Sequence, residues 1–421
     1  MGESGERESP PDADGESYHA EDSERGQATS MGKDVTEGGS PHRRRAPDTV
    51  GSAARKPTSL RGIADQAQAD KQHRFRDLYG CLNVEFLVDC WGDRQKDAAS
   101  GVDGVTWQAY AEPLQAPVEA LVARLKQKRY RAKLSRRRDM PQGNGPARPL
   151  GIPVVEDTLL QAAGARLLTA IDAPEVLACR DGYRPGRGAG EAVRDLPCDL
   201  QYGRDGYVVE ADIQGFFAHM DHDWLPKMLR VRIDDRAFLG LIRQWLNAGI
   251  LETAGRVVHP DTGVPQGGGV SPVFANGYWH DALDLWVEKV VKPHGRGEAV
   301  ISRDADDCGC AFRFRSDAAW LYQVLPKRLG KFKREVSPEK TRILRCSRFH
   351  PGMTRRFTCW GFELFWTEDR QGVPRVKRRT ARKKLQSACK RIKAWIQATR
   401  HLPGHAVFNG LNARLRGQYR D

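Results

Sequence analysis

The sequence predicts an α+β fold, on three observations. Apolar residues recur three and four positions apart in stretches such as 113–130 and 155–171, and this spacing predicts amphipathic helices. Shorter apolar runs, in GYVVEADIQGFF (206–217) and ISRDADDCGCAF (301–312), predict buried strands. Residues 1–59 contain no Leu, Ile, Phe, Trp or Cys, and such a segment cannot bury enough apolar surface to fold. We therefore expect a disordered N-terminal tail ahead of a folded region.

The charge of the chain is concentrated near its C-terminal end. The 421 residues carry a net charge of +14. Fifteen Lys or Arg residues, and no Asp or Glu, lie between Arg370 and Arg420. A basic block of this kind favours a polyanionic partner such as nucleic acid. The alternative is a solvated helix face, although such faces usually mix both signs of charge.

The cysteines and the hydropathy pattern indicate the cellular compartment. The nine cysteines form no CxxC pair and no Cys/His cluster with zinc spacing. Cys308 and Cys310 are expected on one face of a strand as buried free thiols, which suits a reducing environment. No apolar run reaches the length of a membrane span, and the N-terminus lacks the hydrophobic region of a signal peptide. The sequence therefore predicts a cytoplasmic protein.

The first half of the ordered region is expected to begin near Leu60 and to be mostly helical. Residues 75–91 place their apolar side chains on one helical stripe. Residues 140–153, MPQGNGPARPLGIP, are rich in Gly and Pro and predict a loop that carries Arg148. The stretch 155–171 that follows predicts a long helix with one apolar side.

The second half alternates strands and helices. The strand within 206–217 leaves Asp212 at its end, and 263–272 contains too many glycines for a regular element. Further helices are expected over 222–233, 236–250, 271–291, 317–333 and 385–396. Pro272 suits the first turn of its helix, because the N–H that proline lacks has no helical partner there.

Three aspartates at strand ends form the candidate catalytic group. Asp306 and Asp307 lie between the apolar runs AVIS and CGCAF, which predicts the tip of a β-hairpin. Two adjacent carboxylates repel one another, and a cation removes that repulsion. Together with Asp212 they match the hard oxygen ligands of Mg²⁺ pairs that catalyse phosphoryl transfer. The alternative is an ordinary acidic turn, because Asp is common in turns.

Several blocks around these aspartates occur in a characteristic order: SGVDGVTWQAY, GNGPARPLGIPVVEDTLLQAA, GYRPGRGAGEAV, VVEADIQGFFAHMDHDWL, GVPQGGGVSPVFAN, RDADDCGCAF, VSPEKTRILR, CWGFEL and LNARLRGQY. Together they resemble the reverse transcriptase/maturases encoded by group II introns. The resemblance extends from about Phe75 to Asp421. One block alone would be a weak signal, whereas this many in this order is a specific one.

The resemblance implies a right-hand polymerase with fingers, a ferredoxin-like palm and a helical thumb. The implied domains are a disordered tail (1–59), an N-terminal extension with fingers (60–205), a palm with finger insertions (206–366) and a truncated basic helical thumb/maturase segment (367–421). The implied activity is two-metal nucleotidyl transfer onto a primer 3′-hydroxyl by an RNA-directed DNA polymerase, with an RNA-binding role in intron splicing and mobility. The implied partners are an intron RNA template, a DNA primer or target and deoxynucleoside triphosphates. The implied cofactor is two Mg²⁺ per site, with Mn²⁺ as a substitute.

The resemblance also assigns roles to individual residues. Asp212, Asp306 and Asp307 match the catalytic metal ligands. The implied nucleotide-binding residues are Arg148, Phe217, Gln266 and Lys340. The implied RNA-binding residues are Arg378, Arg379, Arg382, Lys383, Lys384, Lys390, Arg391 and Lys393.

Three of these assignments have plainer alternatives. Phe217 matches the aromatic residue that blocks a ribose 2′-hydroxyl, but from the sequence alone it could equally be a core residue. Arg148 could form a surface ion pair instead of binding a triphosphate. Lys340 could be an exposed lysine in a turn.

The chain departs from the family pattern at two positions near the aspartates. Asp304 replaces the tyrosine of the usual Tyr-Ala-Asp-Asp, and Ala218 replaces an acid in FFAHMDH. A third negative charge raises neighbouring carboxyl pKa values and disturbs a metal shell. The alternative function is therefore a catalytically impaired, RNA-binding maturase relic with a truncated C-terminus. A metal-dependent nuclease is disfavoured, because no catalytic His or Lys pairing stands out beside the aspartates.

Overall fold

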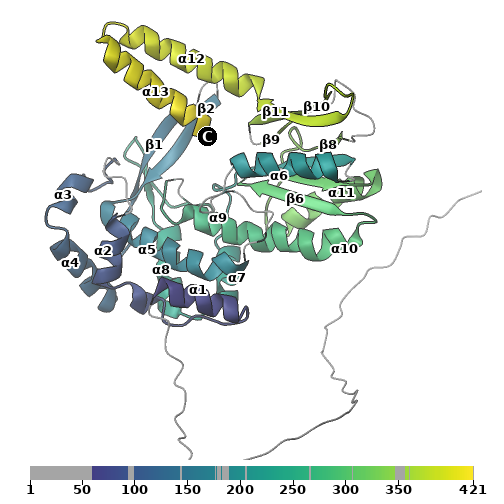
Figure 1. The fold of residues 1–421 in the computed structure, drawn as a ribbon. Helices are drawn as coiled ribbons and strands as arrows, with labels where there is room; N and C mark the ends of the chain where they lie inside the picture. Colours follow the sequence, from purple (N-terminus) through teal and green to yellow (C-terminus); the bar gives the residue numbers. More distant parts are fainter. Residues whose placement is uncertain are drawn as a thin grey trace, which may run out of the picture. The chain divides into compact units, whose positions relative to one another are not determined.

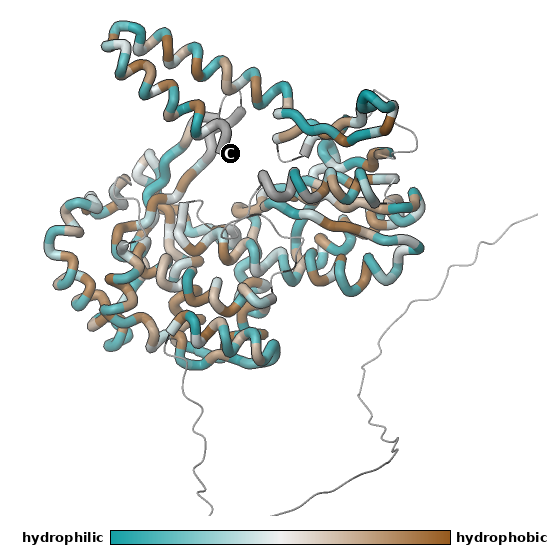
Figure 2. The backbone as a smooth tube through the Cα atoms, viewed as in Figure 1, coloured by the Kyte–Doolittle hydropathy of each residue, from teal (hydrophilic) through white to brown (hydrophobic). Residues whose placement is uncertain are grey.

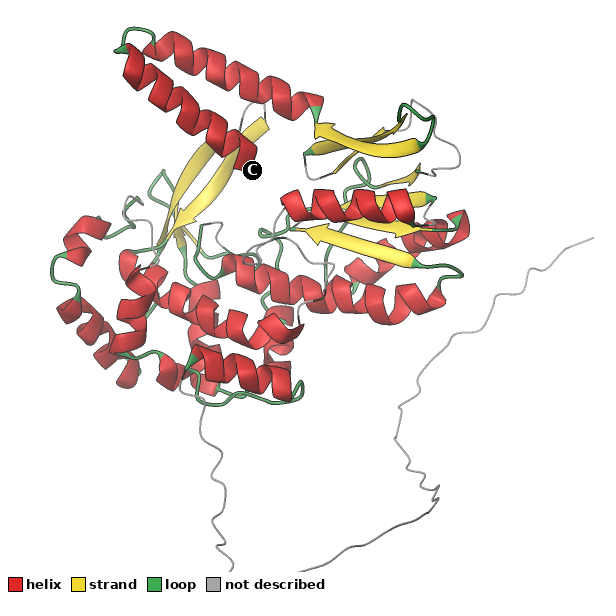
Figure 3. Cartoon of the chain, viewed as in Figure 1, coloured by secondary structure: helices red, strands yellow, loops and turns green. Residues whose placement is uncertain are grey.

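A computed structural model of the chain describes residues 59–92, 99–142, 145–175, 177, 182, 189–203, 206–264, 267–305, 307–346, 356–359 and 361–420. The chain divides into two units, Met1–Ala54 and Arg55–Asp421, and every described residue belongs to the second. The predicted disordered tail, apart from Ser59, lies outside the described residues. The second unit contains both helices and sheets (Figures 1 and 3), which confirms the mixed α+β fold class.

The α-helices are α1 (Leu60–Ala69), α2 (Val84–Gly92), α3 (Trp107–Ala111), α4 (Gln115–Lys126), α5 (Val155–Asp172), α6 (Ala189–Tyr202), α7 (Trp224–Arg232), α8 (Arg236–Leu246), α9 (Ser271–Trp279), α10 (Lys292–His294), α11 (Arg315–Gly330), α12 (Arg382–Thr399) and α13 (Gly404–Arg420). Short 3₁₀ turns are η1 (Tyr79–Cys81) and η2 (Ala173–Glu175), and π-helical segments are η3 (His280–Asp284) and η4 (Val287–Val291). Side-chain caps begin several helices. The Asp235 carboxylate, for example, accepts from the N–H groups of Ala237 and Phe238 at the start of α8.

The strands are β1 (Ser135–Gln142), β2 (Gly145–Ile152), β3 (Tyr207–Asp212), β4 (Ile250–Leu251), β5 (Val257–Val258), β6 (Ala299–Asp304), β7 (Asp307–Phe312), β8 (Arg342–Arg345), β9 (Arg356–Cys359), β10 (Phe362–Glu368) and β11 (Pro374–Thr380). They form sheets of order β2-β1-β4-β5, β6-β7-β3-β8 and β11-β10-β9. The central sheet β6-β7-β3-β8 carries the predicted aspartates, and its neighbouring strands are antiparallel.

The central sheet is buried on both faces, because alternate residues of its strands enter two different cores. Val209 and Cys310 belong to the main core, in which α11 also packs. Val208 and Ala311, one position away on the same strands, pack in a second core with Leu196 of α6. Strands β9 and β10 complete that second core through buried side chains of their own, namely Phe357, Leu364 and Trp366. The near-continuous apolar run of β3 is therefore explained by burial on two sides.

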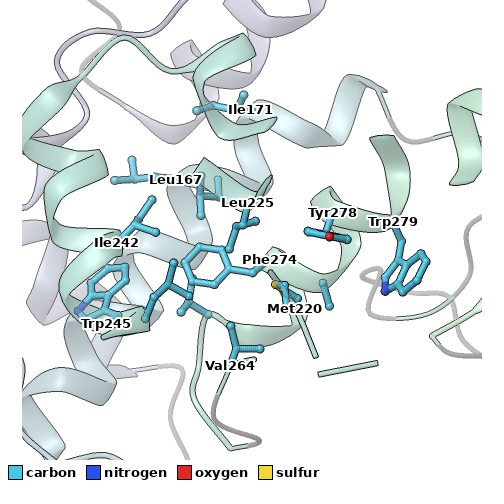
Figure 4. Close-up of a cluster of buried hydrophobic side chains, with 14 of the residues drawn as sticks. Leu167, Ile171, Met220, Leu225, Ile242, Trp245, Val264, Phe274, Tyr278 and Trp279 are labelled. Carbon is cyan, nitrogen blue, oxygen red and sulfur yellow. The ribbon is translucent and has the colours of Figure 1, made fainter. Parts of the chain in front are cut away.

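The main core lies among α5, α7, α8 and α9. Figure 4 shows Phe274 of α9 surrounded by Leu225 of α7, Trp245 of α8 and Met220. Glycine permits one close helix contact here, because a Cβ on Gly164 of α5 would lie 2.8 Å from the Trp245 ring. Within the described residues, no helix combines the length and the hydropathy that crossing a membrane requires.

The prediction of a loop over 140–153 is wrong, because residues 140–142 end β1 and residues 145–152 form β2, which pairs with it. The register pairs Arg136 with Ile152 and Met140 with Arg148. The register shifts between Met140 and Gln142, so the intervening Pro141 occupies an irregularity where a missing N–H is tolerated. β2 is the edge strand of its sheet, which also tolerates its prolines.

Two predicted helices are shorter than the apolar pattern suggests. The stretch 75–91 becomes helical only at Val84, because Phe75 forms a β-bridge with Ile233 and a 3₁₀ turn follows it. The helix predicted over 236–250 ends at Leu246, and Ile250 begins β4. Both apolar patterns are satisfied by tertiary contacts instead of helix continuation.

A buried carboxyl group at the start of α5 makes stability depend on pH. Asp157 is 2% exposed, and its oxygens accept from the Tyr130 hydroxyl (2.6 Å) and from the Lys133 N–H (2.8 Å). Burial raises the pKa of Asp157 to about 6, although these two hydrogen bonds partly oppose the rise. Because the pKa in the folded state exceeds the unfolded value of 3.8, the folded state binds the proton more tightly between these values.

The free energy of unfolding is therefore expected to fall as pH rises from about 4 to 6, by up to about 3 kcal/mol from this group. An Asp157→Asn variant should lose that part of the slope, as measured by denaturant unfolding at several pH values. Asp281, whose pKa burial also raises to about 6, should leave a residual slope in the variant. An identical slope in both proteins would contradict the prediction.

Candidate functional site

Three aspartates lie side by side at one end of the central sheet. The register pairs Asp212 of β3 with Asp307 of β7, and Asp307 in turn with Asp304 of β6. Directly opposed residues of antiparallel strands point to the same face, with Cβ atoms about 4.5–5.5 Å apart. The structure therefore places Asp212 and Asp307 next to each other. Asp306 lies outside the described residues.

The hairpin that carries these aspartates has the predicted tight turn. Asp304 and Asp307 are the last pair of β6 and β7, so the loop contains two residues. Ala305, the first of them, has φ = 55°, a positive value typical of two-residue hairpin loops but strained for a residue with a side chain. Gly182 lies against this turn, because a Cβ there would be 2.6 Å from the Ala305 nitrogen and from the Asp304 carboxylate.

A buried ion pair supports the same hairpin from the opposite face. The Arg303 guanidinium donates to both carboxylate oxygens of Asp284, at 2.7 and 2.6 Å, and both side chains are 0% exposed. Arg303 Nη1 also donates to the Ala305 carbonyl at 3.4 Å. Asp284 ends the π-helical segment η3, and such segments are frequent at functional sites. Arg303 thus connects the turn at Ala305 to the π-helical segment η3 through Asp284.

A lysine lies next to the aspartates on the open side of the sheet. Lys340 Nζ is 3.0 Å from each carboxylate oxygen of Asp212, although the Lys340 side chain is 67% exposed. The predicted nucleotide-binding lysine therefore contacts a predicted metal ligand directly. Its positive charge offsets part of the repulsion between facing carboxylates, which is unfavourable across a strand pair.

The segment that carries Lys340 runs along the chain that leaves β3. The Ser337 N–H donates to the Asp212 carbonyl (2.8 Å), and the Gln214 N–H donates to the Glu335 carbonyl (3.0 Å). Arg342 Nε donates to Glu210 at 2.8 Å, on the same face as Asp212. Burial raises the pKa of Glu210, and the Asp212 charge raises it further while Arg342 lowers it. On this face Glu210 and Asp212 are therefore each paired with a basic side chain.

The turn after Asp212 is joined to the glycine-rich loop. The Val264 N–H donates to the Phe217 carbonyl at 2.9 Å, and the Gly263 N–H donates to the Met220 carbonyl at 2.6 Å. Gly263 has φ = 88°, and a Cβ there would collide with the Ala218 carbonyl. Phe217 is half-buried and meets Phe216 edge-on, with ring centroids 5.0 Å apart. Both readings of Phe217 remain open, since it packs against the core and is still partly exposed.

Backbone contacts also connect this loop to the β1–β2 hairpin. Gly267 has φ = 108°, and a Cβ there would lie 2.9 Å from the Gly151 carbonyl oxygen. On the other side of the hairpin root, a Cβ on Gly101 would lie 2.6 Å from Val154 Cα. Arg148 lies on β2 opposite Met140, whereas Gln266 lies outside the described residues. The predicted nucleotide-binding segments thus adjoin one another near Gly151 and Gly267.

The donor set fits a divalent cation. Asp212 and Asp307 supply hard carboxylate oxygens from facing strands, and the Lys340 ammonium against Asp212 shows that a cation is favoured at this carboxylate. Among the described residues, which leave out Asp306, no three His, Cys, Asp or Glu side chains gather closely enough to form an ion site. Asp212 and Asp307 alone are therefore a partial site.

The predicted RNA-binding residues lie on β11 and α12 and are exposed. Figure 2 shows hydrophilic residues along much of both elements. Ala388 is the buried residue of α12, so most of this helix faces solvent. Arg379 is partly neutralised, because its Nε donates to Glu363 at 2.7 Å and its guanidinium lies 5.0 Å from the Phe365 ring centroid. An aromatic side chain of the neighbouring strand β10 therefore lies beside the basic surface formed by β11 and α12.

Sequence reasoning missed two buried arginines beside the site. Arg303 directly precedes the predicted turn, and Arg334 lies in the segment that leads to Lys340. The available signal was an arginine within an apolar strand, AVISRD, because a charged residue there needs a buried partner. For Arg334, in GKFKREVSP, the neighbouring charges conceal the buried position.

Comparisons with known proteins show the family of the chain. Residues 135–371, more than half of the chain, match the profile of the family described as "Reverse transcriptase (RNA-dependent DNA polymerase)". The matched region begins with β1 and includes Asp212, Asp307 and Lys340.

Three curated relatives are similar over part of their length. Protein YkfC of Escherichia coli (strain K12) is 32% identical over 179 residues, which are 42% of this chain and 47% of YkfC. The group II intron-encoded protein LtrA of Lactococcus lactis subsp. cremoris is 36% identical over 33% of this chain and 23% of its own. An uncharacterized 91 kDa protein in a cob intron of Schizosaccharomyces pombe is 34% identical over 41% of this chain and 21% of its own. The matches thus span less than half of each relative.

Proposed function

Because this chain belongs to the reverse transcriptase family, we propose that it is an RNA-directed DNA polymerase of the group II intron type. The relatives named as intron-encoded proteins confirm the resemblance predicted from the sequence motifs. The observation that carries the proposal is the pairing of Asp212 with Asp307 across β3 and β7, beside Lys340. Paired carboxylates at the end of a sheet are suited to hold the metal ions of nucleotidyl transfer.

The predicted architecture fits the observed elements. The central sheet with α11 corresponds to the palm within 206–366. The β1–β2 hairpin and the helices of 60–205 correspond to the fingers and the N-terminal extension. The helices α12 and α13 correspond to the thumb segment of 367–421. These assignments are part of the proposal.

Each residue has a role in the proposed reaction. Asp212 and Asp307, together with Asp306, would hold two Mg²⁺ ions, or Mn²⁺ in their place. The bound ions supply activation of the primer 3′-hydroxyl and charge neutralisation at the leaving pyrophosphate. Lys340 lies close enough to Asp212 to contact the phosphates of a nucleotide held there. Arg148 and Gln266 would bind the triphosphate from the neighbouring loops, and Phe217 would exclude a 2′-hydroxyl.

The partners follow from the same assignments. The phosphates of the primer–template duplex would contact the basic surface of β11 and α12. The exposed Lys and Arg residues of this surface suit contacts that do not depend on sequence. An intron RNA as template and ligand is proposed by analogy with the intron-encoded relatives.

The test is primer extension by the full chain on poly(rA)/oligo(dT) with dTTP and Mg²⁺ or Mn²⁺. We expect metal-dependent incorporation, which a chelator stops. Absence of incorporation with either metal, from protein that still binds structured RNA, would refute the polymerase assignment.

A second candidate function, RNA binding without polymerisation, is favoured by one observation. Asp304 faces Asp307 directly across the hairpin and adds a carboxylate beyond those of the three proposed metal ligands. The same extension assay with an Asp304→Tyr variant discriminates the two functions. An inactive wild type and an active variant would show that Asp304 impairs catalysis, whereas equal activity would remove the argument for the impaired form.

A further inference from the structure

A buried arginine lies behind the turn that carries Phe217. Arg334 is 2% exposed, and its Nη2 donates to the carbonyl oxygens of Gly215 (3.0 Å) and Phe216 (3.1 Å). Its Nε and Nη1 have no hydrogen-bond partner among the described residues. Burial lowers the pKa of this guanidinium, as expected for a cation removed from water. A buried cation held mainly by two carbonyl groups is costly, so its position calls for an explanation.

A continuous series of ring contacts leads from Arg334 to Phe217. The guanidinium carbon lies 5.1 Å from the Trp279 ring centroid. Trp279, which is 0% exposed, stacks on Phe216 with centroids 5.6 Å apart and an interplanar angle of 10°. Phe216 in turn meets Phe217 edge-on. Arg334 therefore contacts the Phe216–Phe217 pair through both the backbone and the aromatic rings.

The turn needs such support. Gly215 adopts φ = 56°, and glycine is the residue that restrains the backbone least. Phe217 is only half-buried, so core packing restrains one side of its ring. Arg334 fixes the two carbonyl groups immediately before Phe217, and these set the direction in which its side chain leaves the backbone.

We propose that Arg334 is a positioning residue that holds the Phe217 ring in place and thereby sets the discrimination between deoxynucleotides and ribonucleotides. This inference rests on the proposed function, in which Phe217 meets the sugar of the incoming nucleotide. Steric exclusion of one hydroxyl group depends on ring position, and a displacement of about 1 Å can change a rate about a hundredfold. Arg334 itself touches neither the sugar nor the phosphates in this account.

The chain offers a closely matched control in Arg328 of α11. Its Nε donates to the Ala282 carbonyl (2.9 Å) and its Nη2 to the Asp281 carbonyl (3.0 Å). Its guanidinium carbon lies 4.7 Å from the Phe332 ring centroid, and burial lowers its pKa as well. Arg328 thus makes the same kinds of contact as Arg334, but with the π-helical segment η3 and not with the Phe217 turn.

The experiment compares wild type, Arg334→Met and Arg328→Met as full chains. Steady-state primer extension on an RNA template gives kcat/KM for dTTP and for UTP. Binding of each nucleotide to the complex with a dideoxy-terminated primer, which cannot be extended, gives the affinity in the absence of the reaction. We expect Arg334→Met to lose about tenfold or more of the dTTP/UTP ratio in both measurements. Arg328→Met should keep the wild-type ratio while also losing thermal stability, although less, because Arg328 is only partly buried. Arg334→Lys, which retains the charge but not the planar guanidinium beside the Trp279 ring, should be intermediate and serves if the methionine variant does not fold.

The outcomes separate this inference from the proposed function. Phe217→Ala should abolish the discrimination. If it does and Arg334→Met behaves like Arg328→Met, the positioning role is overturned and the polymerase assignment stands. If the wild type neither incorporates nor retains a nucleotide, the proposed function fails and the role of Arg334 fails with it.

Discussion

Replacing Asp212 by asparagine is expected to reduce primer extension at least about a thousandfold, which corresponds to roughly 4 kcal/mol of transition-state stabilisation. Asparagine preserves the size of the side chain but removes the charge that pairs with Lys340 and that would hold a metal ion. The measurement is the single-turnover rate of dTTP addition to a primer on an RNA template. Binding of structured RNA should persist, because the basic surface of β11 and α12 is untouched.

Glu210→Gln is the matched control for this variant. Glu210 lies two residues earlier on the same face of β3, and its carboxylate pairs with Arg342. Loss of charge there should leave extension within a few-fold of wild type. If Asp212→Asn extends primers as fast as Glu210→Gln, the carboxylate of Asp212 takes no part in the reaction.

Replacing Arg303 by methionine is expected to destabilise the protein by about 3–5 kcal/mol, because Asp284 is left as an uncompensated buried charge. The lost contact to the Ala305 carbonyl should also loosen the hairpin that carries Asp307. The measurement is denaturant-induced unfolding, followed by circular dichroism.

Two further variants test the cause of that loss. Arg303→Met combined with Asp284→Leu should recover most of the stability, because apolar residues of similar volume can replace a buried ion pair. Arg342→Met removes an exposed pair with Glu210 and should cost less than about 1 kcal/mol. Equal losses from the two single arginine variants would show that burial does not govern the contribution of the Arg303–Asp284 pair.

The sequence predicted the structure correctly where a local pattern of residues is compatible with one kind of element. The doubly buried strand of 206–217 could end only where polar residues resume, so Asp212 was placed correctly at its end. The hairpin of 301–312 followed from two apolar runs separated by a short acidic turn. That the two aspartates face each other depends on the antiparallel pairing of β3 with β7, which local patterns do not encode. That expectation came from the chemistry of a metal pair and from the resemblance to a family.

The errors arose where tertiary contacts outweighed local preference. The prolines of 140–153 indicated a loop, but an edge position and a local irregularity accommodate them within a hairpin. The apolar residues of 75–91 recur with a helical period, but Phe75 forms a β-bridge with Ile233 and is not part of a helix. The Arg303–Asp284 pair joins residues 19 positions apart and could not be read from either segment alone.

The root of the β1–β2 hairpin has a mechanical consequence. Gly101 and Gly267 come from two distant segments of the chain. Each lies so close to the backbone of Gly151–Val154 that a Cβ atom would not fit between them. A strand of eight residues extends about 26 Å from such an anchor. A rotation of three to five degrees at the root would therefore displace the far end of the strand by about 1–2 Å over this length.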